Sequence, residues 1–420
     1  MTTTTTTTTS AAVANMFHPD SFPDGAYYRD YFFVGGEYVP VEDSSSTAQF
    51  GGSIMKGQTY VECLVPVAGG VRRPFPLILV HGGGQSGLNW LHTPDHRPGW
   101  ASYFLAQGFA VFIVDTPSRG RSAPDLAQHH TTYSTGFVEQ WFTAPSSSSS
   151  SWPQAALHTQ WPGTGRRGDP TFDAFYASTY PSTSDLPAYQ VSQKTALVAL
   201  LERIARPCIL LTHSQGAPGG WLAADARPDL VRAIVAVEPN GPPFTGHHPH
   251  NGAPARAWGL TDVPIAYWPP VADASEFNLE TVPHSSAQQQ QPGRDPTVLQ
   301  KEGGPQGHVV RKLRHLQHIP VLVEVGEASY HAPYDHATVA FLRQAGVECD
   351  FIRLEERGIR GNGHMQMLEL NNLDIARVLE EWIRTRVEER EDGGGGMRDV
   401  VERGQDEDGT GQEGQDRIGG

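Results

Sequence analysis

The stretch that decides the fold is ILLTHSQGA, Ile209–Ala217. An apolar run stops there at a polar turn with Ser214 at its tip, and an alanine-rich, helix-compatible segment follows. This order reads as strand, sharp turn and helix, and such a turn can hold a serine hydroxyl clear of a sheet. The usual pattern is G-x-S-x-G, but Thr212 replaces its first glycine. A serine in such a turn is more often a plain turn residue, so the rest of the chain must decide.

Short apolar segments alternate with helix-compatible segments on both sides of this turn. Such runs are typical of buried parallel strands, and helices between them imply right-handed βαβ crossovers. The sequence therefore predicts an α/β fold with a mostly parallel central sheet flanked by helices. The aromatic segment Tyr27–Pro40, with its Gly35-Gly36 pair, is typical of a β-hairpin. The expected strands of the sheet lie at residues 76–80, 109–114, 208–211, 231–237, 320–325 and 347–354.

The composition excludes several classes of protein. The 420 residues carry a formal net charge of −15, which argues against nucleic acid or an anionic membrane as a partner. No stretch is long and apolar enough to span a membrane, and the N-terminus lacks the basic and apolar regions of a signal peptide. We therefore expect a cytoplasmic location, with secretion as the open alternative. Buried free thiols are expected at Cys63, Cys208 and Cys349.

Low-complexity segments divide the chain. Residues 1–26 are rich in threonine and residues 391–420 are acidic and rich in glycine, so both ends are predicted to be disordered. One domain is expected over residues 27–390, with irregular insertions at about 124–189 and 240–306. The tryptophans of the first insertion could cap a pocket as a lid or could pack locally, and the sequence does not choose between these readings.

Three chemically useful side chains each follow a predicted strand. In an open α/β sheet the functional groups gather outside the carboxyl ends of the strands. Ser214, Glu238 and His364 occur there in the order serine, acid, histidine, which is the order of α/β-hydrolases. A serine hydroxyl needs an imidazole to take its proton, and a carboxylate to hold that imidazole in the right tautomer. We therefore predict these three residues as a catalytic triad.

The acid is the least constrained member of this set. Many α/β-hydrolases carry it after the penultimate core strand, where Glu327 and Asp335 stand in this chain. Glu238 instead continues directly from the strand that follows the serine turn, and Pro239 restricts the backbone after it. The residues alone favour Glu238 and leave Glu327 as the alternative.

An oxyanion that forms during ester cleavage needs backbone N–H groups already aimed at it. One predicted donor is the N–H of Gln215, the residue after the serine. The other is expected from the turn HGGG (81–84), where Gly83 is favoured and Gly84 is the alternative. This chemistry requires no metal and no organic cofactor, and no cysteine or histidine spacing in the chain indicates a zinc site.

Several segments resemble a family of bacterial carboxylesterases with the α/β-hydrolase fold, whose triad glutamate follows strand six. Carried over by motif, that family's nucleophile, acid and base correspond to Ser214, Glu238 and His364, and its oxyanion donors to Gly83 and Gln215. The bacterial members have adjacent cysteines after the His-Gly pair, where this chain has Gly83-Gly84. The matching segments are HGGGQSGLNW (81–90), TPDHRPGW (93–100), DTPSRGRSA (115–123), THSQGA (212–217), VAVEP (235–239) and GNGHMQMLELNNLDIARVLEEWI (361–383).

The sequence and the resemblance together predict a serine hydrolase that acts on a small-molecule carboxylic ester or lactone. The same triad could serve a C–C hydrolase, a lyase or an acyltransferase, because the fold does not fix the reaction. A catalytically silent binding module is a third reading, but it predicts a broken triad position, and none is visible. The ester, the lid contacts and the oligomeric state are not encoded in any recognisable pattern.

Overall fold

The computed structural model describes residues 26–41, 50–67, 69–124, 129–147, 152–247, 252–282, 295–303 and 309–389. The terminal segments predicted to be disordered lie outside these ranges, except for residue 26. Part of the serine run in the first insertion and the whole glutamine run in the second also lie outside them.

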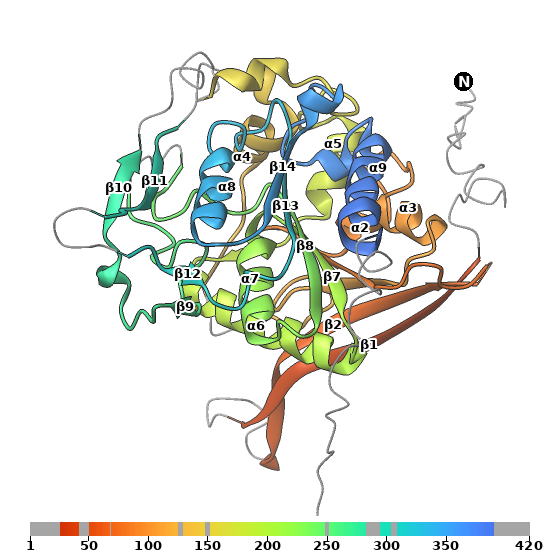
Figure 1. Ribbon diagram of the computed structural model, residues 1–420. Coiled ribbons are helices and arrows are strands. Elements are labelled where there is room, and N and C mark those ends of the chain that lie inside the picture. Colours follow the sequence, from red (N-terminus) through yellow and green to blue (C-terminus); the bar gives the residue numbers. More distant parts are fainter. Residues whose placement is uncertain are drawn as a thin grey trace, which may run out of the picture.

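An eight-stranded sheet runs through the middle of the molecule in the order β1-β2-β4-β3-β7-β8-β13-β14 (Figure 1). From β4 to β14 all neighbouring strands are parallel, whereas the pairs β1–β2 and β2–β4 at one edge are antiparallel. This arrangement confirms the predicted α/β fold with a mostly parallel sheet. The strands are β1 (Tyr27–Pro40), β2 (Ser53–Pro66), β3 (Leu77–Val80), β4 (Val111–Asp115), β7 (Cys208–His213), β8 (Val231–Val237), β13 (Val321–Val325) and β14 (Cys349–Arg353).

Helices cover both faces of this sheet because its central strands are apolar on both sides. In β3, Leu77 and Leu79 pack with α3 and α9, whereas Ile78 and Val80 pack on the opposite face with α6, α7 and α8. The alternation follows from the two-residue period of a strand. The helices are α2 (Leu88–Leu91), α3 (Trp100–Ala106), α6 (Leu186–Ile204), α7 (Ala217–Ala226), α8 (Asp335–Gln344) and α9 (Asn372–Ile383).

The predicted hairpin within Tyr27–Pro40 is wrong. These residues form the single strand β1, which pairs along its length with β2. Gly35 and Gly36 do have positive φ angles, of 63° and 81°, but the chain does not reverse there. A Cβ atom at Gly36 would lie 2.9 Å from the backbone nitrogen of Gln58. The two glycines therefore permit a local bend and a close strand approach rather than a turn.

The two insertion regions contain short elements instead of further sheet strands. The first carries β5 (His130–Thr131), α4 (Thr135–Val138), a π-helical turn (Glu139–Thr143), 3₁₀ turns (Pro145–Ser147 and Pro153–Leu157), α5 (Pro170–Ala177) and β6 (Ser182–Thr183). The second, with the segment after it, carries β9 (Tyr267–Trp268), a 3₁₀ turn (Ala274–Glu276), β10 (Leu279–Val282), β11 (Thr297–Gln300) and β12 (Lys312–Leu313). Figure 1 shows β10 and β11 as a separate ribbon outside the main sheet.

All three cysteines are free thiols, with Cys208 and Cys349 buried and Cys63 partly buried. The prediction of buried free thiols is therefore confirmed for Cys208 and Cys349, whereas Cys63 is free but only partly buried. Over the described part of the chain, no helix has the length and apolar character needed to cross a membrane.

Candidate active site

Ser214 lies at the sharp turn between β7 and α7, as the sequence predicts. Its φ angle is +50°, a left-handed conformation that costs energy for any residue except glycine. Two contacts hold this turn. The Asn240 N–H donates to the Ser214 carbonyl at 3.1 Å, and Gly216 sits so close to the His81 carbonyl that a Cβ would lie 2.6 Å from it. The partly exposed Ser214 side chain is thereby presented at the carboxyl end of the sheet.

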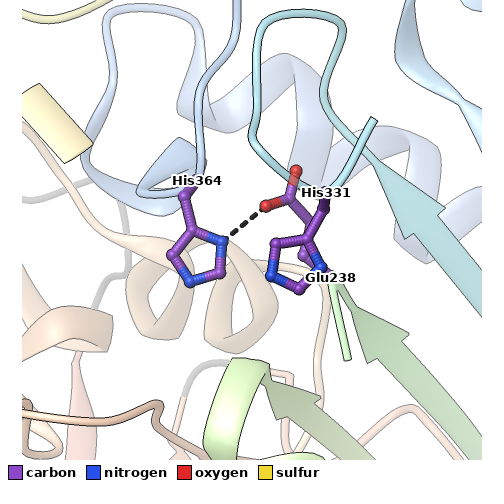
Figure 2. A group of neighbouring side chains, drawn as sticks. All are labelled: Glu238, His331 and His364. Atoms are coloured by element: carbon purple, nitrogen blue, oxygen red, sulfur yellow. Dashed lines mark hydrogen bonds and ion pairs between the residues drawn. The ribbon is translucent and has the colours of Figure 1, made fainter. Parts of the chain in front are cut away.

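Glu238 and His364 meet directly, although 126 residues separate them (Figure 2). Nδ1 of His364 lies 2.6 Å from Oε2 of Glu238, and both side chains are buried. Glu238 directly follows β8, and His364 stands in the loop between β14 and α9. Parallel strands end at one edge of the sheet, and the two residues come together there.

Two further groups hydrogen-bond the Glu238 carboxyl. The Gly326 N–H donates to Oε1 at 2.8 Å, and the Ser329 hydroxyl donates to Oε2 at 2.6 Å. Burial raises the pKa of Glu238 well above its usual value, while these two hydrogen bonds act in the opposite direction because they favour the carboxylate. Burial lowers the pKa of His364 to about 3. The neutral imidazole is the form that can accept a proton.

Glu327, the alternative acid, does not contact His364. Its carboxylate instead accepts from Nη1 of Arg360 at 2.7 Å and from the Gly361 N–H at 2.9 Å. It therefore braces the loop that leads to His364. Asp335, the other acidic residue after the penultimate strand, is also engaged elsewhere, because its Oδ1 lies 3.1 Å from Nδ1 of His331.

The loop that carries His364 is fixed by a buried carboxylate that the sequence did not point to. The Gly363 N–H and Nδ2 of Asn362 donate to Glu369 at 2.9 and 2.8 Å, and Nε2 of His158 lies 2.7 Å from the same side chain. In addition, Nε2–H of His213 donates to the His364 carbonyl at 3.1 Å. His364 is thus held through its backbone from two sides.

The glycine turn at residues 81–84 lies against the serine turn. A Cβ at Gly82 would lie 2.9 Å from Cβ of Ser214, and one at Gly83 would lie 3.0 Å from Oε1 of Gln215. Gly84 has a φ of +67° and packs against the Tyr133 ring. The two segments expected to supply oxyanion donors are therefore neighbours, and the donor role of their N–H groups stays a prediction.

Aromatic side chains of the first insertion lie over the site. The Phe142 ring stacks on His364 at a centroid distance of 5.5 Å. Trp141 and Trp152 contact the Tyr330 ring at 5.1 and 6.1 Å. Of the two readings of this insertion, the contacts favour a cap over the site.

A cluster of Glu238, His331 and His364 has ligand atoms within 4.8 Å of one another, so its fit to a metal ion needs testing (Figure 2). The two imidazole rings are stacked with an interplanar angle of 7° and a centroid distance of 4.7 Å. A histidine nitrogen binds metal along its lone pair, which lies in the ring plane. Two stacked, parallel rings cannot both direct a lone pair at one ion, so this arrangement does not fit a shared metal.

Comparisons with known proteins agree with this architecture. A family model described as alpha/beta hydrolase fold matches residues 76–270. A fungal protein named "Probable secreted lipase phiG" (Fungal sp., strain ATCC 74256) is 44% identical over 371 residues, which span 88% of this chain and 93% of the relative. A solved structure of a novel bacterial esterase superimposes with a TM-score of 0.53 at 23% identity, covering 85% of this chain and 95% of that one. The chain therefore belongs to the α/β-hydrolase fold family.

Proposed function

We propose that the protein is a serine hydrolase that cleaves a carboxylic ester or lactone through an acyl-enzyme on Ser214. The observation that carries this proposal is the buried 2.6 Å contact between His364 and Glu238 beside the strained turn of Ser214. Similarity to a protein named as a lipase supports ester hydrolysis as the reaction. The same relative is named as secreted, so the cytoplasmic location has no support from it, and we propose secretion instead.

In the proposed mechanism, Oγ of Ser214 attacks the ester carbonyl while Nε2 of His364 takes its proton. Glu238 stabilises the imidazolium that forms, and the N–H groups of Gly83 and Gln215 bind the oxyanion. The C–O bond then breaks and the leaving alcohol receives the proton from His364. A water molecule next attacks the acyl-enzyme with His364 again as base, which releases the acid and restores Ser214.

Hydrolysis of a short-chain p-nitrophenyl ester and covalent labelling by a fluorophosphonate test this proposal. We expect turnover and one label per chain for the wild type, and loss of both for Ser214→Ala. The control is Ser192→Ala, since that hydroxyl bonds the Ala188 carbonyl in α6, outside the site. A wild type that neither turns over esters nor accepts the label would overturn the serine-hydrolase proposal and leave the binding-module reading. Labelling without ester turnover would redirect the proposal to a lyase, C–C hydrolase or acyltransferase reaction.

A further inference from the structure

The turn after β13, residues 326–331, contacts every member of the proposed triad. Its Gly326 N–H and Ser329 hydroxyl donate to Glu238. The hydroxyl of Tyr330, in the same turn, lies 3.3 Å from Nε2 of His364. The Ser214 side chain also lies close enough to this phenol to lower its pKa through hydrogen bonding. Tyr330 thus bridges the nucleophile and the base.

In the proposed mechanism, the position of the Tyr330 hydroxyl matters for departure of the leaving group. The leaving-group oxygen is attached to the carbon that Ser214 attacks, and it must receive its proton from Nε2 of His364. It therefore has to reach hydrogen-bonding distance of Nε2 on the side of Ser214. The Tyr330 hydroxyl already occupies this gap, so an incoming ester brings its alcohol oxygen next to the phenol.

Packing keeps the phenol beside the gap. The Tyr330 ring lies 5.1 Å from Trp141 and 4.5 Å from His331, measured between ring centroids. The backbone on either side is fixed too, because the His331 N–H donates to the Ser329 hydroxyl at 3.1 Å. Burial raises the pKa of Tyr330 well above 10, so the phenol keeps its proton and acts as a donor. A slight displacement of the ring by substrate leaves that donor within reach of the leaving oxygen.

Resting on the proposed hydrolase function, we propose that Tyr330 is a catalytic residue whose hydroxyl donates a hydrogen bond to the leaving-group oxygen. As the C–O bond breaks, its electron pair stays on the alcohol oxygen and the proton on Nε2 of His364 moves to that oxygen. Tyr330 keeps its own proton throughout. The hydrogen bond strengthens as negative charge develops, so it lowers the barrier instead of merely improving binding.

The leaving group's basicity separates this role from a structural one. An alkoxide develops more charge on oxygen than p-nitrophenolate does, so it gains more from a donor. We compare kcat/KM for ethyl butyrate and p-nitrophenyl butyrate, which form the same acyl-enzyme on Ser214. Tyr330→Phe keeps the ring and removes only the hydroxyl. We expect a loss of about five- to ten-fold for the ethyl ester and less than about two-fold for the p-nitrophenyl ester, as for one lost hydrogen bond.

Tyr334→Phe is the matched control, because the Tyr334 hydroxyl is buried and has no hydrogen-bond partner among the described residues. It should leave the ratio of the two kcat/KM values unchanged. Equal losses on both esters, or no loss on either, would overturn the role of Tyr330 while leaving the hydrolase intact. A folded Tyr330→Phe variant is recognised by full fluorophosphonate labelling. If the wild type itself fails to hydrolyse and to label, the proposed function fails and this inference falls with it.

Discussion

The Ser329 hydroxyl donates a 2.6 Å hydrogen bond to Oε2 of Glu238, the same oxygen that lies 2.6 Å from Nδ1 of His364. One carboxylate oxygen of Glu238 therefore accepts hydrogen bonds from two donors. Ser329 does not contact the base itself, so it acts on His364 only through the position and charge of Glu238. That makes Ser329 a positioning residue of the proposed triad.

Ser329→Ala should lower kcat by about five- to ten-fold, since one hydrogen bond is lost. It should also shift the acid limb of the pH profile. The Ser329 bond lowers the pKa of Glu238, so its removal raises that pKa further and the carboxylate becomes protonated at higher pH. Activity needs the carboxylate, so the acid limb moves to higher pH. The measurement is kcat/KM against pH. An acid limb at the same pH as in the wild type would refute the proposal that Ser329 acts through the charge of Glu238.

Replacement of each candidate acid by glutamine should give very different results for the two residues. Glu238→Gln removes the negative partner of Nδ1 and should cut kcat by about a thousand-fold or more. Glu327→Gln alters only the brace to Arg360 and Gly361, so we expect kcat within about ten-fold of wild type. Steady-state hydrolysis of p-nitrophenyl butyrate distinguishes them. If Glu327→Gln were inactive and Glu238→Gln active, the role of triad acid would be assigned to Glu327 instead.

Gly82→Ala should inactivate the enzyme without unfolding it. The added methyl would lie 2.8 Å from Nδ1 of His213 and 2.9 Å from Cβ of Ser214, which forces the serine turn to shift. Displacement of a nucleophile by about 1 Å costs about a hundred-fold in rate. The matched control is Gly136→Ala in α4, where a Cβ meets nothing within 4 Å. Fluorophosphonate labelling rates compare the two, and equal rates would contradict the steric argument.

Glu369→Gln should destabilise the fold as well as slow the reaction. The substitution places an amide NH₂ among three donors, those of Gly363, Asn362 and His158. Loss of a buried charged acceptor costs about 2–3 kcal/mol in the free energy of unfolding. Urea denaturation measures that change. Glu381→Gln, on the exposed side of α9, should remain within about 0.5 kcal/mol of wild type, and an equal loss there would argue against a specific network.

Much of this architecture could be predicted from strand ends. An apolar run that stops at a polar residue marks both a strand and the edge where its neighbours also stop, so Ser214 and Glu238 could be assigned to one edge. His364 followed from its place in a glycine loop before the last helix. The glycine pair at 35–36 led to the wrong prediction of a hairpin, because a hairpin turn and a bend within one strand both use positive φ angles. Only the pairing of β1 with β2 shows that the segment is one bent strand.

The supporting groups could not be predicted in the same way. Ser329 and Tyr330 follow a strand end, but their neighbours in sequence give no sign of which carboxylate or imidazole they meet. Glu369 contacts His158 across 211 residues and lies in a segment that resembles an ordinary helix start. Such contacts depend on how loops from different strands pack together, and side-chain periodicity does not encode that packing.

The indole pair above the site has a spectroscopic consequence. Trp141 and Trp152 lie 5.4 Å apart, and both touch the tyrosine that bridges Ser214 and His364. Two indoles at this distance couple their strong electronic transitions, so they contribute a pair of bands of opposite sign to the far-ultraviolet circular dichroism. A ligand that settles beneath them changes both their spacing and the polarity around them. The protein therefore carries an intrinsic optical reporter of ligand arrival, which can be followed in stopped flow with unlabelled substrates.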